Sequence, residues 1–373
     1  MTGKPGRRKI LPETDGREMP AVIRINTAGT ARSAGGSPAL TCERTGTVKG
    51  QRTDSGEGKA RAGKAGEEMP DRKTEIKADH NTENKSENGQ CAETPHTYQE
   101  WLHYGKTLLQ EQGVADAETD AWLLMEYVSA ITRVYYAMHG REKMDEAEAQ
   151  TYEGLLKKRA SHIPVQYITG EAWFYGYSFR VTPDVLIPRL DTEVLVEQAE
   201  LRILPGMNIL DMCTGSGCIL LSILKRHSVS GVGADLSERA LDVARSNQKR
   251  IGVRGASWIR SDLFQNIGGT FSMIVSNPPY IASAEIETLS PEVRDYEPRQ
   301  ALDGRADGLY FEKKIAGEAR KHLKPGGWLL LEIGCGQGKE MREYLAGAGY
   351  QEVEIIKDLG GNDRVAAGRT ENV

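Results

Sequence analysis

The first quarter of the chain lacks aromatic residues altogether. All 5 Trp, 14 Tyr and 5 Phe residues of the 373-residue sequence lie at or after Tyr98. Residues 1–97 are instead crowded with Gly, Ser, Thr, Lys, Arg, Glu and Asn, so they cannot bury enough apolar surface to offset the entropy lost on folding. We therefore expect residues 1–97 to form a disordered tail. Its basic clusters are interspersed with acidic residues, which favours a solvated tail over a nucleic-acid-binding arm.

Long hydrophobic runs and metal-ligand patterns are missing as well. No apolar stretch approaches the roughly 18 to 20 residues that a membrane span needs, and the N-terminus has no apolar core like that of a secretion signal. The 5 cysteines include no Cys-x-x-Cys pair and no Cys/His cluster with the spacing of metal ligands. These absences predict a cytoplasmic protein without a membrane span or a bound metal.

The chain also lacks an excess of positive charge. Its formal net charge is -5 at pH 7, so it has no global positive field and strong binding of nucleic acid through bulk charge is not expected. Hydrophobic residues make up 39% of the sequence, which at this length permits two folded domains.

Residues 98–165 carry apolar side chains at helical spacing, for example Trp101, Leu108 and Leu109. This spacing predicts a small helical domain, which serves either for packing alone or as a surface that docks a substrate. Over residues 166–188 the period changes, and aromatic residues are interrupted by glycines. That pattern predicts a β-hairpin linker between two domains.

From residue 189 to residue 373, short apolar runs alternate with amphipathic segments. The runs predict strands at 207–212, 231–234, 257–260, 273–276 and 328–333. Helices are expected between them, for example at 238–249 and 309–323. This alternation is typical of a doubly wound, Rossmann-like α/β sheet.

A glycine-rich turn follows the first of these strands, with the sequence Asp-Met-Cys-Thr-Gly-Ser-Gly at 211–217. Glycines let the backbone pass close to a ligand at the N-terminus of the next helix. A dinucleotide-binding loop would have its third glycine or alanine at position 220, where this chain has Leu220, so that fingerprint fails. Asp211 either holds the turn or meets an amino group of the ligand. Cys213 and Cys218 are expected to fill small spaces rather than act as nucleophiles.

Two more strand ends carry residues suited to a nucleoside. The second strand ends at Asp235, which is placed to accept hydrogen bonds from ribose hydroxyls. The third ends at Ser261, Asp262 and Leu263, where an acid and an apolar side chain could receive an adenine amino group and its ring. Three such elements in order predict a cofactor site.

The fourth strand is stopped by the motif Asn277-Pro278-Pro279-Tyr280, at the edge where α/β proteins bind ligands. A carboxamide or exocyclic amino nitrogen is a poor nucleophile because its lone pair is delocalised, and its two N–H groups need acceptors. The Asn277 side-chain oxygen and the Pro278 carbonyl can accept one each, while Tyr280 can stack on the planar group. The prolines fix this turn. The motif therefore predicts an S-adenosylmethionine-dependent methyltransferase that acts on a planar nitrogen.

Four further segments narrow this prediction. They are Pro-Val-Gln-Tyr-Ile-Thr-Gly at 164–170, Leu-Ile-Pro-Arg-Leu-Asp-Thr-Glu at 186–193, Glu-Pro-Arg-Gln-Ala-Leu-Asp-Gly at 297–304 and Asp-Leu-Gly-Gly-Asn-Asp-Arg at 358–364. Together with the glycine turn and the 277–280 motif, they make the chain from about Tyr98 onward resemble the protein-(glutamine-N5) methyltransferases of peptide chain release factors, the PrmC/HemK type.

The resemblance implies a class I methyltransferase fold that methylates the side-chain nitrogen (N5) of the glutamine in the Gly-Gly-Gln loop of release factors, with the helical domain helping to dock the factor. It implies that S-adenosylmethionine contacts Cys213, Thr214, Gly215, Ser216, Gly217, Asp235, Leu263 and Asn277. The glutamine would be held by Asn277, Pro278, Pro279 and Tyr280, with Asn277, Pro278 and Tyr280 as the catalytic residues. Two positions depart from the family pattern: Cys213 replaces a usual glycine, and Leu190 a usual proline.

Two alternatives remain beside the prediction of a glutamine methyltransferase. An adenine-N6 methyltransferase of DNA or RNA could use the same motif, but it would need a basic face and a base-reading module, neither of which is evident after Tyr98. A binding protein could keep the fold without catalysis. Intact Gly215, Gly217, Asp235 and Asn277 argue against that alternative.

Overall fold

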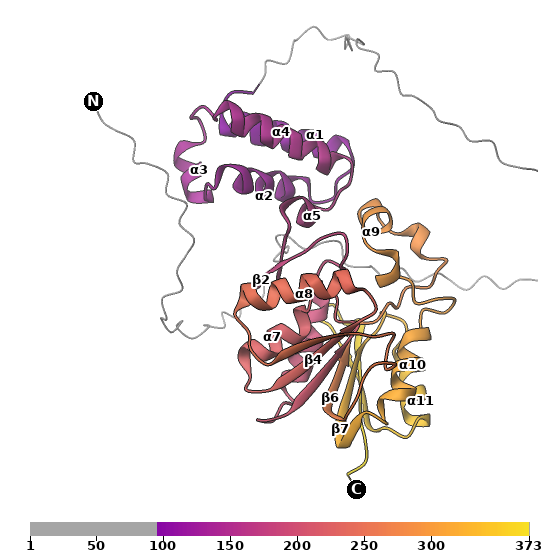
Figure 1. Cartoon of the computed structure of the whole chain (residues 1–373). Helices are drawn as coiled ribbons and strands as arrows, with labels where there is room; N and C mark the ends of the chain where they lie inside the picture. Colours follow the sequence, from indigo (N-terminus) through magenta and orange to yellow (C-terminus); the bar gives the residue numbers. More distant parts are fainter. Residues whose placement is uncertain (1–94, 373) are drawn as a thin grey trace, which may run out of the picture. The chain divides into compact units, whose positions relative to one another are not determined.

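The computed structural model describes residues 95–372 of the chain (Figure 1). The tail expected over residues 1–97 therefore lies outside the described residues, apart from its last three. Of these, Thr97 caps the first helix. Its hydroxyl accepts a hydrogen bond from the main-chain nitrogen of Glu100 at 3.2 Å, and the Glu100 carboxylate accepts one from the main-chain nitrogen of Thr97 at 3.0 Å. This reciprocal capping box fixes the start of the helix.

The residues after Thr97 form a group of helices, as their apolar spacing predicts. The helices are α1 Tyr98–Glu111, α2 Ala117–Ser129, α3 Arg133–His139, α4 Glu146–Ala160 and α5 Val165–Thr169. Leu109, Leu124 and Leu156 are fully buried between them, and the buried Tyr152 hydroxyl donates to the Ala121 carbonyl at 2.9 Å. These helices have a core of their own.

A β-hairpin follows the helices, within the range 166–188 but shorter than it. Strands β1 Glu171–Phe174 and β2 Tyr177–Arg180 pair antiparallel, and α5 occupies the residues before them. The turn residues Tyr175 and Gly176 have φ values of 51° and 81°, the positive values that tight hairpin turns require.

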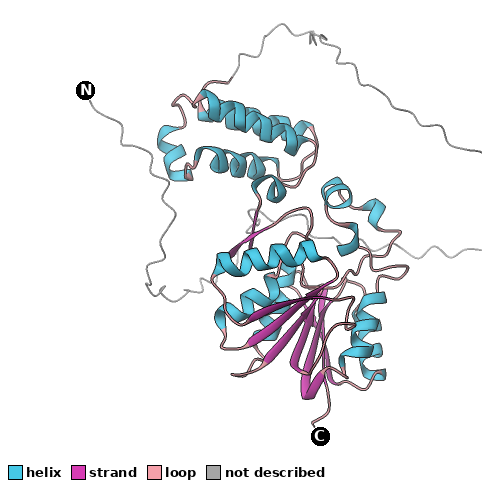
Figure 2. Cartoon of the chain, in the orientation of Figure 1, coloured by secondary structure: helices cyan, strands magenta, loops and turns pink. Residues whose placement is uncertain are grey.

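A seven-stranded sheet forms the centre of the remaining chain (Figure 2). Its strands are β3 Asn208–Met212, β4 Ser230–Asp235, β5 Ala256–Arg260, β6 Phe271–Ser276, β7 Leu323–Glu332, β8 Gln351–Lys357 and β9 Asp363–Arg369. Their order is β5-β4-β3-β6-β7-β9-β8, with β9 antiparallel to both neighbours and the other pairs parallel. The order reverses between β3 and β6, and ligands of α/β proteins bind at such a switch point. The predicted doubly wound class is confirmed.

Helices cover both faces of this sheet (Figure 1). One face carries α6 Glu193–Glu200, α7 Cys218–Arg226 and α8 Glu238–Ile251, and the other carries α10 Tyr310–Ala319 and α11 Gly338–Gly347. The short elements η1 Leu190–Thr192, η2 Ile286–Thr288, α9 Pro291–Tyr296 and η3 Arg299–Ala301 lie in the connections. Apolar side chains such as Leu220 on one face and Ile315 on the other are fully buried against the strands.

Two neighbouring predicted boundaries were wrong. The helix expected at 309–323 ends at Ala319, and β7 already begins at Leu323 rather than at residue 328. Residues 324–327, Lys-Pro-Gly-Gly, resemble a turn in the sequence. In the fold they lie within the strand at a register irregularity, where Leu323 pairs with Phe271 and Trp328 with Met273.

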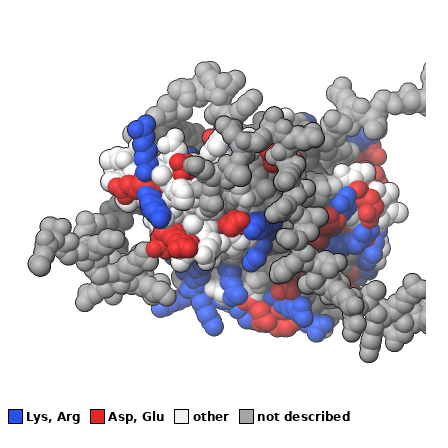
Figure 3. All heavy atoms as spheres, turned by 90° about the horizontal axis from the view of Figure 1, so that it is seen from above, with Lys and Arg blue, Asp and Glu red and all other residues white. Residues whose placement is uncertain are grey.

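The surface of the described residues carries both signs of charge. On the face seen in Figure 3, Lys and Arg side chains are interspersed with Asp and Glu side chains. Within residues 95–372, no helix combines the length and the apolar character needed to cross a membrane.

Candidate functional site

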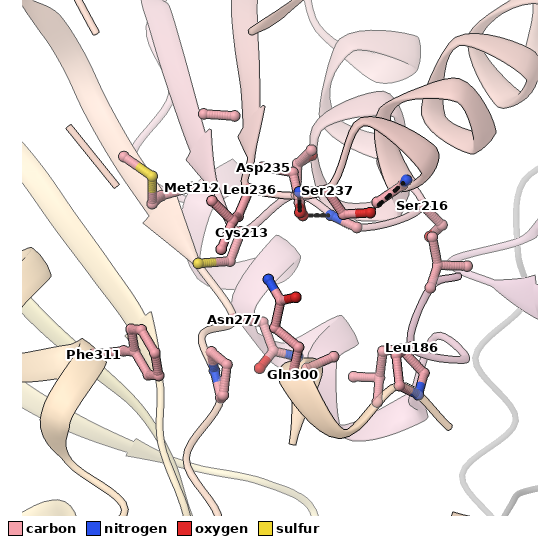
Figure 4. A pocket seen from close by; sticks show the side chains of 18 of the residues that line it. Leu186, Met212, Cys213, Ser216, Asp235, Leu236, Ser237, Asn277, Gln300 and Phe311 are labelled. Carbon is pink, nitrogen blue, oxygen red and sulfur yellow. Dashed lines mark hydrogen bonds between the residues drawn. The ribbon is translucent and has the colours of Figure 1, made fainter. Parts of the chain in front are cut away.

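A cavity of about 730 Å³ opens at the carboxyl ends of β3, β4 and β6 (Figure 4). Its lining includes Cys213, Thr214, Gly215, Ser216, Asp235, Leu263, Asn277 and Pro279 from the predicted site, with further residues from segments 183–189 and 298–305. The volume is within the range of small-molecule sites. The fold thus gathers at one place most of the residues that the sequence singled out on separate strand ends.

Asp211 lies beneath the glycine turn rather than in the cavity wall. It is fully buried, and its carboxylate accepts a hydrogen bond of 2.5 Å from the Thr214 hydroxyl. Burial raises the pKa of Asp211 to about 7. Of the two roles that the sequence left open, this position favours holding the turn.

Gly217 has a packing role that the sequence did not indicate. It is the N-cap residue directly before α7, has a φ of 77° and is not part of the cavity lining. A Cβ atom at this position would come within 2.8 Å of the Trp258 side chain. The residue is therefore needed for close packing of the turn against β5, and its predicted contact with the cofactor stays a prediction.

Two residues of the cavity wall have left-handed backbone conformations that favour glycine. Cys213 has a φ of 59° and Leu263 a φ of 47°. The substitution of the family's glycine by Cys213 therefore falls on a position that requires a positive φ. Burial, and then the nearby Asp235 carboxylate, raise the pKa of the Cys213 thiol well above its usual range, which disfavours the nucleophilic thiolate.

Asp235 connects the glycine turn to the second strand end. Its Oδ2 accepts a hydrogen bond from the main-chain nitrogen of Gly215, and its Oδ1 accepts one from that of Ser237, both at 2.9 Å (Figure 4). Burial raises the pKa of Asp235, and these main-chain donors oppose the shift. A carboxylate has about four acceptor sites, so acceptor capacity remains for hydroxyl groups in the cavity.

The third strand end is held in its unusual conformation by Ser261. The Ser261 hydroxyl donates to the Leu263 carbonyl at 2.5 Å and accepts from the main-chain nitrogen of Asn266 at 3.0 Å. These bonds stabilise the positive φ of Leu263 and keep its side chain, which is 8% exposed, in the cavity wall. Ser261 and Asp262 line the cavity beside it.

In the 277–280 motif, Asn277 faces the cavity with a defined amide orientation. Its Nδ2 donates to the Thr192 hydroxyl at 3.2 Å, which leaves Oδ1 available as an acceptor. Pro279 also lines the cavity, whereas Pro278 and Tyr280 do not belong to its lining. The Tyr280 hydroxyl donates to the buried Glu332 at 3.3 Å. The stacking role of Tyr280 therefore stays a prediction.

The backbone of the 277–280 motif is held in place by residues far along the chain. Gln337 Nε2 donates to the carbonyls of Tyr280 and Gly308, each at 3.0 Å. A Cβ atom at Gly308, whose φ is 70°, would lie 2.4 Å from the Tyr280 carbonyl oxygen. Only glycine fits at this approach.

Segments 186–193 and 297–304 meet at another wall of the cavity. The buried Glu297 carboxylate forms an ion pair with Arg189 and accepts a hydrogen bond from the main-chain nitrogen of Ile187 at 3.1 Å. Leu190, at the position where the family usually has proline, begins η1 and is 55% exposed. Within the second segment, Gln300 points its side chain into the cavity close to Asn277 (Figure 4).

A buried charge cluster lies under the motif. Arg364 Nη2 is 3.0 Å from Asp358 Oδ2 and 3.2 Å from Asp191 Oδ2. Glu332, at the end of β7, is fully buried, and this burial raises its pKa to about 7, although Thr192, Arg364 and Tyr280 oppose the shift. Sequence reasoning did not assign roles to Thr192 or Glu332.

Asn247 is another residue that sequence reasoning missed. It is fully buried on α8, and its Nδ2 donates to the Ser216 carbonyl at 2.9 Å and to the Arg180 carbonyl at 3.0 Å. Asn247 therefore holds the glycine turn against the hairpin. A polar residue on the apolar side of a predicted amphipathic helix is the signal that could have revealed it.

The helical region and the region of the seven-stranded sheet each resemble known protein families. Residues 100–170 match the family model of the PrmC N-terminal domain, and residues 189–291 match that of the methyltransferase small domain. The release factor glutamine methyltransferase of Geobacter sulfurreducens is 39% identical over 275 residues, which cover 73% of this chain and 96% of that protein. The release factor glutamine methyltransferase of Cereibacter sphaeroides is 40% identical over 263 residues, covering 70% and 94%. Among solved structures, a methyltransferase from Pyrococcus furiosus aligns with a TM-score of 0.43 at 20% identity, covering 58% of this chain and 99% of that one.

Proposed function

This chain belongs to the release factor glutamine methyltransferases, and from that premise we propose that its cavity binds S-adenosylmethionine next to a glutamine side chain held by the 277–280 motif. The protein is an enzyme that transfers a methyl group from S-adenosylmethionine to the side-chain amide nitrogen of a release factor glutamine. The observation that supports the proposed site most directly is the orientation of Asn277, whose amide nitrogen is engaged by Thr192 while its oxygen stays available at the cavity.

The residues of the cavity fit this cofactor. Asp235 keeps acceptor capacity for ribose hydroxyls, and Leu263 offers an apolar contact for the adenine ring. The turn residues 213–216 also line the cavity, with Gly215 directly beside Asp235, and the methionine portion would lie against them. When bound, S-adenosylmethionine supplies a methyl group activated by a positively charged sulfur.

The motif orients the nitrogen that receives this methyl group. The Asn277 side-chain oxygen and the Pro278 carbonyl accept the two N–H groups of the glutamine amide and point its lone pair toward the methyl group. The same acceptors stabilise positive charge as it develops on the nitrogen. No separate general base is required, because the nitrogen becomes acidic as the methyl group is transferred.

The same proposal covers which loop of the release factor is methylated and which part of the enzyme docks the factor. We place the methylated glutamine in the Gly-Gly-Gln loop of peptide chain release factors and the enzyme in the cytoplasm. Residues 98–165 act as the docking domain. This role is supported by the exposed apolar side chains of α2 and α3, among them Tyr127, Val134 and Met138, which are 55%, 70% and 70% exposed. Such surfaces are common at protein–protein contacts.

Strong nucleic-acid binding is not part of this proposal. Basic and acidic side chains are interspersed on the described face that Figure 3 displays, and the net charge is -5. A methyltransferase that extracts adenine from a duplex needs a continuous basic surface to hold the phosphates.

One assay tests the substrate directly. The enzyme is incubated with isotopically labelled S-adenosylmethionine and either a bacterial-type release factor or duplex DNA, and the label is located by mass spectrometry. We expect the label on the glutamine of the Gly-Gly-Gln loop and none on the DNA. Label on adenine, with an unmodified release factor, would overturn the proposal.

A further inference from the structure

We propose that Thr192 and Glu332 are positioning residues, which set the direction of the hydrogen bonds so that Asn277 presents its side-chain oxygen to the substrate. This inference rests on the proposed function, because it concerns the acceptor for the glutamine N–H group. Neither residue is required to touch the substrate. Both act through the orientation of the Asn277 amide.

An asparagine amide has two nearly isosteric orientations, so its surroundings must choose between them. Asn277 lines the cavity, and its Nδ2 donates to Thr192 Oγ1 at 3.2 Å, so this bond leaves the oxygen as the end of the amide that a ligand can use. In the reversed orientation, an NH₂ group would face the NH₂ group of the substrate. Two donors cannot form a hydrogen bond with each other, so that orientation would not hold the glutamine.

While the Thr192 hydroxyl accepts from Asn277, its own hydrogen must point elsewhere. Thr192 lines the cavity but is only 2% exposed, so its hydroxyl has little access to bulk water. We assign this hydrogen to the Glu332 carboxylate, because one oxygen of that fully buried carboxylate lacks a hydrogen-bond partner and the Thr192 hydroxyl lies near enough to favour its ionised form. Glu332 Oε1 already accepts from the Tyr280 hydroxyl, while its Oε2 is a buried acceptor that has no hydrogen-bond partner among the described residues.

An ionised carboxylate has no hydrogen to give, so it forces both hydroxyls to donate toward it. The chain of donors therefore runs from Asn277 to Thr192 and from Thr192 to Glu332. A protonated Glu332 could donate to Thr192 instead. The Thr192 hydroxyl would then donate to the Asn277 oxygen and reverse the amide.

The charges around Glu332 come from three further elements. Arg364 on β9 favours the ionised carboxylate, Asp191 on η1 opposes it, and the Tyr280 hydroxyl after β6 favours it. Asp358 forms an ion pair with Arg364 and shares its charge. Burial opposes ionisation most strongly, and we therefore expect the turnover number kcat to fall in mild acid as Glu332 takes up a proton.

The decisive variants are Glu332→Gln and Thr192→Val, both close in shape to the native residues. Gln at 332 can donate to Thr192 as the protonated acid would, and Val at 192 removes the hydroxyl. We expect each variant to lower kcat for release factor methylation about 10²-fold, because one positioned acceptor is lost, while the Kd for S-adenosylmethionine and the Tm change little. Thr192→Ser keeps the hydroxyl and should restore most of the turnover. The acid limb of the kcat profile should disappear in Glu332→Gln.

Glu312→Gln is the matched control. Glu312 is also fully buried, its pKa is raised to about 9 by burial, and it lies outside both the cavity lining and the Asn277 network. Wild-type kcat in Glu332→Gln, or a kcat loss of the same size in Glu312→Gln, would overturn the proposal. So would parallel losses of cofactor affinity and Tm, which indicate a structural role alone.

A second measurement separates this inference from the proposed function. NMR of the Asn277 side-chain amide in the enzyme without substrate should show one hydrogen-bonded N–H, and this signal should be lost in Thr192→Val. An unchanged signal would overturn the inference whatever the enzyme methylates. Failure of the wild-type enzyme to label a release factor would contradict the proposed function, and the NMR result would still decide the orientation of Asn277.

Discussion

Glu297 and Arg189, which are 108 positions apart in the sequence, form a buried ion pair that joins two segments of the cavity wall. The Glu297 side chain is 1% exposed, and the same carboxylate also holds the main-chain nitrogen of Ile187. A buried charge that loses its partner is costly, because the remaining charge is neither solvated nor paired. The ion pair therefore links the stability of the fold to the shape of the site.

Replacing this acid should destabilise the fold. We expect Glu297→Gln to lower the free energy of unfolding by about 3 kcal/mol, because it leaves Arg189 without a counter-charge. Denaturant titration measures the change. The control is Glu287→Gln, which breaks the exposed pair with Arg299 and should cost less than about 1 kcal/mol. Equal effects of the two substitutions would refute the role of burial.

Removing the acceptor at Asn277 should reduce catalysis selectively. We expect Asn277→Ala to lower kcat for methyl transfer about 10²-fold or more, because one positioned acceptor for the amide N–H is lost. Binding of S-adenosylmethionine, measured by calorimetry, should be retained. Wild-type turnover in this variant would contradict the assigned role.

The conformation of Cys213 predicts a difference between two small substitutions. Both Cys213→Gly and Cys213→Ala remove the thiol, but only glycine relieves the strain of a φ of 59°. We therefore expect Cys213→Gly to be the more stable of the two by about 1 kcal/mol in thermal or denaturant unfolding. If the alanine variant is as stable as the glycine variant, the backbone at 213 is not strained.

The close approach at Gly308 can be tested against a glycine in open space. Gly308→Ala places a Cβ atom against the Tyr280 carbonyl, and it should lower both kcat and the free energy of unfolding. Gly361 has a φ of 81° with nothing within 4 Å of an added Cβ atom, so Gly361→Ala should cost only about 1 kcal/mol of backbone strain. Similar kcat values for both variants would show that the close approach of Gly308 to Tyr280 does not position the 277–280 motif.

Asp211 should make stability depend on pH. Its pKa is about 7 in the folded protein, raised by burial from its ordinary value of 3.8, so the folded state binds more protons than the unfolded state between these values. The free energy of unfolding should therefore fall as the pH rises from about 4 to about 7. Asp211→Asn removes this contribution, and its stability relative to the wild type should increase over that interval. Parallel pH profiles of the two proteins would contradict the shifted pKa.

Local patterns predicted much of the fold and part of the site. Residue periodicity is a property of neighbouring positions, so it identified the helices of residues 98–165 and the five parallel strands. The glycine turn and the 277–280 motif were recognised for the same reason, since each is a short segment directly after a strand. The strands β8 and β9 were not predicted, and the end of α10 was placed four residues too late.

The sequence by itself determined which chemical groups are present: a glycine turn, Asp235, Leu263 and the Asn277 amide, in the order of a methyltransferase sheet. Only the tertiary structure decided how they are oriented. It joined Glu297 to Arg189, placed Thr192 against Asn277, and put Glu332 beneath Tyr280. These contacts connect residues 52 to 108 positions apart. No local periodicity encodes such pairs, because they arise only when sheet order and strand register bring the separate strand ends together.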